Sequence, residues 1–177
     1  MADQDIITAQ ELRFERLLDA PVETVWRYLV ESELRARWFM GGETDARPGG
    51  KMELIFDHAR LSDGDVPTPE RYRGNVGSRW HETIVRAEPP HLIAFTWDEG
   101  KAGEVTIELT AIGNRTLLVL THRGLRGPED ARNFGGGWHA HLAVLETRLA
   151  GRAVPDFWAL HRAAEAKAAG CLAPELG

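Results

Sequence analysis

The clearest helical periodicity in the chain lies near its C-terminus, in the stretch 135–151. Its large apolar side chains recur at steps of four, three and four and therefore share one face of a helix: Trp138, Leu142, Leu145 and Leu149. Three glycines open the stretch, and they are interpreted as a flexible lead-in, with backbone amides that hold an anionic ligand group as the alternative. The pattern predicts one long helix whose apolar face needs a partner.

Most of the chain before this helix alternates between apolar and polar residues, as β-strands do. The predicted strands are 11–18, 51–57, 80–87, 91–97, 104–111 and 115–123. In the first of them Leu12, Phe14 and Leu18 share one face, with Arg16 as an unexpected charged member. Turns of a few residues join several of these strands, so neighbouring strands should be antiparallel.

Helical spacing interrupts the strands after residue 21 and returns at the end of the chain. Apolar residues predict a short helix over 22–30, and Ser32 can begin a second one with Leu34, Trp38 and Phe39 as its apolar side. A polar stretch, 57–73, is predicted as a long surface loop. Near the C-terminus, Pro155 and Asp156 should start an alanine-rich helix anchored by Phe157 and Trp158.

These elements predict an α+β fold in which a curved antiparallel β-sheet wraps around one long C-terminal α-helix, with two short helices after the first strand. We divide the chain into an N-terminal tail (1–10), one domain (11–151) and a C-terminal helical extension (152–177). A length of 177 residues is ordinary for one domain with a sizeable core.

Composition argues against several classes of partner. The formal net charge is −6 and no cluster of Lys and Arg stands out, so we expect no nucleic-acid partner. No apolar run approaches 18 residues and the N-terminus does not resemble a signal peptide, so no membrane insertion is expected. Cys171 is the only cysteine, which excludes an internal disulfide and fits a cytoplasmic location.

Signatures of catalysis and metal binding are weak in this sequence. The three serines lie outside any Gly-x-Ser-x-Gly motif, and Cys171 has no histidine beside it in the sequence. His139 and His141 are two residues apart on a helix and would point about 200° apart, so they cannot hold one ion together. No metal site and no cofactor is therefore predicted.

Large aromatic side chains on several inward-facing segments are the most suggestive feature. The candidates are Trp38, Phe39, Phe56, Trp80, Phe95, Trp97 and Trp138. They can form an ordinary core, or they can line an apolar pocket together with Leu142. His122, His141 and Glu82 could supply polar contacts there. The residues alone leave both interpretations open.

Several segments, in order, resemble the SRPBCC superfamily (START/Bet v 1-like domains). They are FERLLDAPVETVWRYLVESELRARWF from residue 14, HETIVRAEPPHLIAFTW from residue 81, LVLTHRGL from residue 118 and GGWHAHLAVLETRLAG from residue 136. The chain is most similar to the branch named for the activator of the heat-shock protein 90 ATPase. VPDFWALH from residue 154 resembles a bacterial stand-alone subgroup. The resemblance covers roughly 14–169 and implies a helix-grip fold with a cavity between the sheet and the long helix.

The resemblance also implies a function, which we state as an expectation. We expect a small hydrophobic molecule to bind in the central cavity, in a stress or detoxification context. Independently of the resemblance, the sheet edges and the segment with Phe157 and Trp158 offer surface for a homodimer, and the oligomeric state is left open. The expected ligand-binding residues are the seven aromatic residues above with His122, His141 and Leu142. A low-demand hydrolase or cyclase using His122 as base in a His/Glu pair is one alternative. A co-chaperone-like interaction module is another, although only about ten residues precede the first predicted strand.

Overall fold

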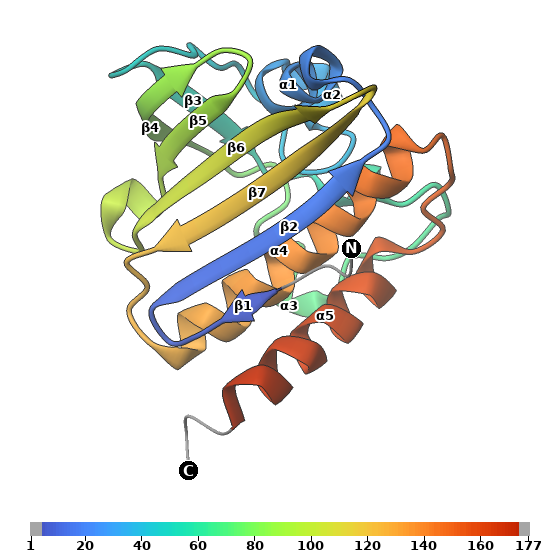
Figure 1. The fold of residues 1–177 in the computed structure, drawn as a ribbon. Helices are drawn as coiled ribbons and strands as arrows, with labels where there is room; N and C mark the ends of the chain where they lie inside the picture. The colour runs from blue at the N-terminus through green and yellow to red at the C-terminus, as the bar shows by residue number, and fades with distance from the viewer. Residues whose placement is uncertain (1–4, 174–177) are drawn as a thin grey trace.

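Seven strands form one antiparallel sheet in residues 5–173, the part of the chain that the computed structural model describes. The sheet curves around the helices (Figure 1). The spatial order of the strands is β1-β2-β7-β6-β5-β4-β3, and every neighbouring pair is antiparallel. In chain order the strands are β1 (Ile6–Ile7), β2 (Glu11–Leu18), β3 (Lys51–Ile55), β4 (Arg79–Glu88), β5 (Leu92–Thr96), β6 (Glu104–Ile112) and β7 (Arg115–Arg123).

The helices gather on one face and one end of this sheet. The long helix α4 runs along β2, and α5 packs against α4, whereas α1 and α2 lie together beyond one end of β6 and β7 (Figure 1). The helices are α1 (Val22–Val30), α2 (Ser32–Arg35), α3 (Glu70–Arg73), α4 (Pro128–Leu149) and α5 (Phe157–Leu172), with 3-10 turns η1 (His58–Leu61) and η2 (Asp98–Gly100). The predicted α+β helix-grip fold is confirmed.

Apolar–polar alternation located the strands well. In β2 the residues predicted to share one face, Leu12, Phe14 and Leu18, are all buried, and Arg16 is buried with them. At the other end of the chain, Asp156 begins α5 as predicted, because its carboxylate accepts a hydrogen bond from the backbone N–H of Ala159.

The long helix begins earlier than its apolar stripe indicated. It starts at Pro128, so the three glycines lie inside α4 and are not a flexible lead-in. One of them, Gly136, is needed for close packing between helices. A Cβ atom on Gly136 would come within 2.9 Å of the Glu165 side chain on α5, and one on Gly135 would touch Leu12 on β2. Gly136 therefore lets α5 approach α4 closely.

Other boundaries also differ from the prediction. The second short helix is a single turn that ends at Arg35, so Trp38 and Phe39 follow it in a loop. Ile6 and Ile7, in the predicted tail, pair with β2, and the predicted surface loop contains η1 and α3. The division into tail, domain and extension stays a prediction.

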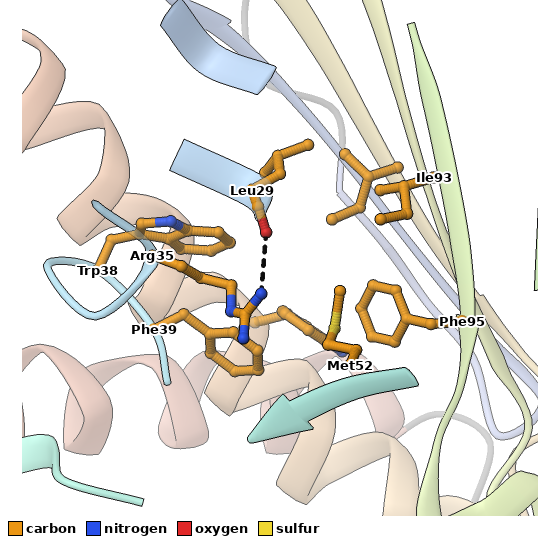
Figure 2. A pocket seen from close by; sticks show the side chains of 9 residues that line it. Leu29, Arg35, Trp38, Phe39, Met52, Ile93 and Phe95 are labelled. Atoms are coloured by element: carbon orange, nitrogen blue, oxygen red, sulfur yellow. Dashed lines mark hydrogen bonds between the residues drawn. The ribbon is translucent and has the colours of Figure 1, made fainter. Parts of the chain in front are cut away.

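The centre of the fold, between α1, α4 and the sheet, is filled by side chains (Figure 2). Only about 10 Å³ stays free there, which is no more space than a single water molecule needs. The surrounding residues are Leu29, Arg35, Trp38, Phe39, Met52, Ile93, Phe95, Ile107 and Trp138. The centre of this helix-grip fold is therefore a packed core.

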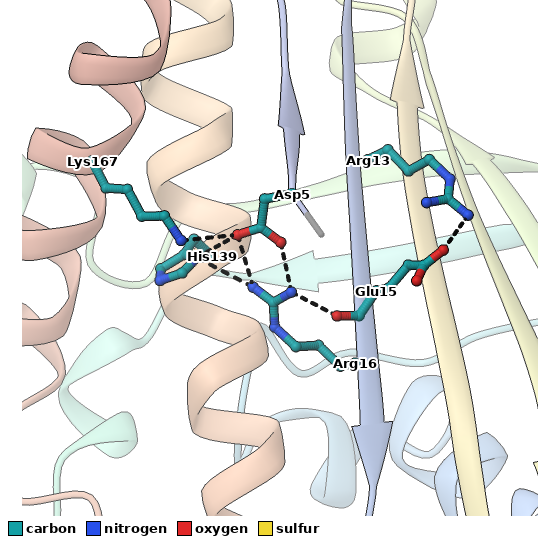
Figure 3. Close-up of polar contacts among 6 residues, drawn as sticks. All are labelled: Asp5, Arg13, Glu15, Arg16, His139 and Lys167. Atoms are coloured by element: carbon teal, nitrogen blue, oxygen red, sulfur yellow. Dashed lines mark hydrogen bonds and ion pairs between the residues drawn. The ribbon is translucent and has the colours of Figure 1, made fainter. Parts of the chain in front are cut away.

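A buried ion-pair cluster explains why Arg16 lies on the apolar face of β2. Nη1 of Arg16 lies 2.7 Å from Oδ1 of Asp5, while His139 on α4 and Lys167 on α5 each approach Oδ2 of Asp5 at 3.2 Å (Figure 3). Burial of Asp5 opposes its ionisation, but hydrogen bonds from His139, Arg16 and Lys167 outweigh this and hold the pKa of its carboxyl well below the usual range. The cluster ties the start of the chain to β2, α4 and α5.

We expect Asp5→Ala to lower the free energy of unfolding by about 2–3 kcal/mol, because it removes the carboxylate that lies 2.7 Å from the buried guanidinium of Arg16. Urea denaturation followed by circular dichroism measures the change. Asp19→Ala is the matched control: its ion pair with Arg115 is exposed, and its loss should cost at most about 1 kcal/mol. Equal losses in the two variants would contradict the proposed role of the cluster.

Candidate functional site

A second space, separate from the filled centre, forms an open pocket of about 310 Å³. It lies where α4 meets the loop after α2, the ends of β3 to β5, α3 and α5. Its lining is Phe39, Met40, Phe56, His58, Arg71, Tyr72, Asn75, Trp80, Trp97, Asn133, Phe134, Gly137, Trp138, His141 and His161. This volume is at the small end of the range of about 300–1,000 Å³ for small-molecule pockets.

Six of the ten predicted ligand-binding residues line this pocket: Phe39, Phe56, Trp80, Trp97, Trp138 and His141. The other four do not. Trp38 and Phe95 belong to the filled centre, and Leu142 is fully buried in the core. The indole N–H of Trp38 donates to the carbonyl oxygen of Tyr28 at 2.7 Å, which fixes that ring in the core. His122 lies behind the pocket wall.

One wall of the pocket consists of aromatic rings in mutual contact. The ring centre of Phe39 lies 5.1 Å from that of Trp138 and 6.2 Å from that of Trp97. Trp97 also lies 5.3 Å from Trp138 and 5.9 Å from Phe134. The rings come from α4, the end of β5 and the loop after α2, so only the fold assembles this wall. Such a surface suits an apolar, flat-sided molecule.

His122 supports this wall. Its Nδ1 accepts a hydrogen bond from the indole N–H of Trp138 at 3.1 Å, so the proton is on Nε2, which donates to the carbonyl oxygen of Ala102 at 2.8 Å. Burial lowers the pKa of His122 and keeps the ring neutral. Because both nitrogens are engaged, His122 positions Trp138, and it is not available as the base of the predicted His/Glu pair.

Glu82, the glutamate expected to supply a polar contact in the pocket, is also absent from the pocket lining. The carboxylate of Glu82 accepts a hydrogen bond from the hydroxyl of Thr96 at 2.6 Å and from the backbone N–H of Glu99 at 3.2 Å. These bonds join β4, β5 and η2. Glu82 is therefore a buried structural group.

Three histidines form the polar side of the pocket, and two of them were not predicted. His58 comes from η1, His141 from α4 and His161 from α5, with the rings of His58 and His141 4.8 Å apart. Burial lowers the pKa of all three, that of His141 to about 4 and that of His58 well below its usual value. The imidazoles are therefore neutral near pH 7.

Arg71 and Tyr72 border the histidines at the mouth of the pocket. The guanidinium of Arg71 lies 4.8 Å from the ring centre of Tyr72 and pairs with Glu165 at 2.9 Å. Both come from the stretch predicted as a surface loop, whose composition gave no sign of a site. The position of His161 could have been predicted from the sequence, because its spacing places it on the same helical face as Phe157, Ala164 and Ala168, which are all buried.

The histidine cluster does not form a metal site. Among residues 5–173, no three His, Cys, Asp or Glu side chains converge in a way that could hold a metal ion. In the same part of the chain, no helix combines the length and the apolar character needed to cross a bilayer.

Solved structures similar to this chain share its fold. The protein encoded by gene BPP1335 of Bordetella parapertussis is 39% identical, with a TM-score of 0.78 over 95% of this chain and 94% of that chain. CalU16 of Micromonospora echinospora is 24% identical, with a TM-score of 0.69 over 97% and 98% of the two chains. EF2215 of Enterococcus faecalis, described as a conserved protein of unknown function, is 19% identical, with a TM-score of 0.65 over 97% and 92%.

Sequence comparison agrees with this likeness. No curated protein sequence matches the chain. The model of the family described as "Activator of Hsp90 ATPase homolog 1-like protein" matches residues 19–150, which include five of the seven strands and all of α4. The resemblance noted in the sequence is thereby confirmed, and the chain belongs to the Activator of Hsp90 ATPase homolog 1-like family within the SRPBCC superfamily.

Proposed function

We propose that this protein binds a small, largely apolar molecule in the pocket of about 310 Å³ between α4 and the ends of β3 to β5. The observation that carries this proposal is the aromatic wall, which borders an open pocket although the centre of the fold is tightly filled. Burying a few hundred Å² of apolar surface at ~25 cal/mol/Å² provides several kcal/mol before the costs of binding, enough for roughly micromolar affinity.

The first test asks whether the pocket takes up a ligand at all. Native mass spectrometry of the purified protein should detect a co-purified small molecule, or a thermal-shift screen of hydrophobic compounds should raise the unfolding midpoint in a concentration-dependent way. If neither occurs over a broad library, the aromatic wall is only core, and the proposal fails.

Substitution of Trp80 tests the position of the site. Trp80→Ala should weaken binding of a hit from that screen about tenfold, because it removes a half-buried aromatic side chain that lines the pocket. Trp138→Ala should weaken binding as well. The matched control is Trp26→Ala, which removes a half-buried tryptophan of α1 outside the pocket. Calorimetry on folded variants measures the affinities, and equal affinity of Trp80→Ala and Trp26→Ala would contradict this site.

A hydrolase or cyclase in the same pocket is the second candidate, favoured by the proximity of His58 and His141. General acid–base catalysis works best with a pKa near the working pH. Burial lowers the pKa of His141 to about 4, which makes it a weak base, and no carboxylate lines the pocket. Binding is therefore the better-supported function. Turnover of an ester or polyketide-like substrate that is lost in His141→Phe would reverse this order.

The family name by itself does not lead us to propose a chaperone partner. The exposed large apolar side chains of residues 5–173 are spread over five segments: Ile6, Val76, Val85, Ile112 and Leu160. An interaction surface of co-chaperone type would need them gathered in one patch. The cytoplasmic location, the homodimer and the stress or detoxification context stay predictions.

A further inference from the structure

The histidine side of the pocket contains hydrogen-bonding groups that the fold does not use. His141 shows this most clearly. Its Nδ1 lies 2.9 Å from the carbonyl oxygen of Trp38, and because a carbonyl only accepts, Nδ1 carries the proton. Nε2 of the neutral ring is then an acceptor with a free lone pair. Within residues 5–173 it makes no hydrogen bond, although the ring lines the pocket.

His58, which lies beside His141, also has a ring nitrogen without a hydrogen-bond partner in the described residues. The side chain is only 7% exposed, and its Nδ1 is buried without a hydrogen-bond partner in residues 5–173. The ring stacks on Phe56 at 4.0 Å and meets His141 edge-on at 4.8 Å, so both imidazoles lie at the same side of the pocket. Buried polar atoms in native proteins are nearly always paired, so an unpaired one next to a pocket points to a partner from outside the chain.

The charged residues of the pocket lining restrict which chemical groups a ligand can place there. Among the described residues that line the pocket, Arg71 is the only one with a permanent charge, and no Asp or Glu is present. A cationic ligand would find no counter-charge there. A carboxylate at the buried end would face the lone pair of His141 Nε2 and could not donate to it. A hydroxyl group can both donate to this lone pair and accept from the N–H of a neutral neighbouring imidazole.

We propose that the pocket selects aromatic molecules with a hydroxyl group at the buried end, a phenol or an enol, whose O–H donates to Nε2 of His141 and whose oxygen faces His58. This inference rests on the proposed function and specifies its ligand. The aromatic wall of Phe39, Trp97 and Trp138 binds the ring system of the ligand, and the two histidines form hydrogen bonds with its hydroxyl group. The hydroxyl distinguishes the ligand from a hydrocarbon of the same shape, because only the hydroxyl pairs with the buried nitrogens.

A matched set of probes tests this inference at pH 7.5: 2-naphthol, 2-methoxynaphthalene and naphthalene, titrated by calorimetry. We expect 2-naphthol to bind the wild-type protein about tenfold more tightly than its methyl ether, which cannot donate a hydrogen bond. His141→Phe and His58→Phe keep a ring in place but remove the nitrogens. In each variant the ratio of the affinities for 2-naphthol and its methyl ether should fall to about one, while naphthalene still binds.

The control is His91→Phe, which changes an exposed histidine between β4 and β5 outside the pocket and should keep the tenfold preference. If His141→Phe fails to fold, His58→Phe and the wild-type preference decide the question. Equal binding of all three probes to the wild-type protein would overturn the inference and leave the proposed function intact. No binding of any probe up to millimolar concentration would overturn both.

Discussion

Replacing Arg35 by methionine should lower the free energy of unfolding by about 4 kcal/mol, a drop in Tm on the order of 10 °C. The guanidinium is 1% exposed, and burial lowers its pKa to about 10, so it stays charged at neutral pH. It donates to one hydroxyl and to four backbone carbonyls that connect α1, the following loop and β3: Thr44, Leu29, Met40, Gly42 and Glu53.

Methionine fills a similar volume but leaves those buried carbonyl oxygens without a donor, and each such loss costs about 1–3 kcal/mol before relaxation. Urea denaturation at pH 7 measures the difference. Arg60→Met is the matched control, because Arg60 is about half exposed and lies 3.5 Å from an exposed Glu33, so its loss should cost under about 0.5 kcal/mol. A loss below about 1 kcal/mol for Arg35→Met would show that this guanidinium does not hold the loop.

Acidification from pH 6.5 to pH 4 should remove about 3 kcal/mol of stability through His141 alone. Burial lowers the pKa of His141 from 6.5 to about 4 in the folded protein, against the opposing effect of the Trp38 carbonyl. The unfolded chain therefore takes up a proton at a higher pH than the folded protein does. The stabilisation is complete above pH 6.5 and is lost as the pH falls toward 4.

His58, His122 and His161 act in the same direction, because burial lowers the pKa of each of them. Unfolding free energies measured at pH 7.5, 5.5 and 4.5 should decrease progressively, and His141→Phe should flatten this profile. His91→Gln, which changes an exposed histidine, should keep the wild-type profile. Equal stability at pH 7.5 and 4.5 would mean that the buried imidazoles accept protons without cost to the fold.

Elements with a strong local pattern were predicted well. Residues 104–111 alternate between polar and apolar side chains, and they form β6, with Val105, Ile107 and Leu109 buried. The spacing of Val22, Val25 and Leu29 predicted α1. In both cases neighbouring residues in the sequence determine which face is buried, so the sequence contains the whole signal.

Features that depend on distant contacts were missed or misinterpreted. The glycines at 135–137 resemble a loop in the sequence, but Gly136 is required because Glu165, on another helix, passes over it. The polar residues of 57–73 resemble a solvated loop, but Tyr72 stacks on Trp158 with ring centres 5.0 Å apart. In each case the partner lies far along the chain, and no local pattern specifies it.

The same distinction applies to the candidate site. The sequence determined the α+β class, the strands, the long apolar-faced helix and the set of aromatic residues from which the pocket is built. Only the tertiary structure decided that Trp38 and Phe95 fill the core while Phe39, Trp97 and Trp138 form a pocket wall, and that His58 and His161 join His141. The physical reason is that burial follows from local periodicity, whereas a cavity depends on how side chains from distant segments fill the space between them.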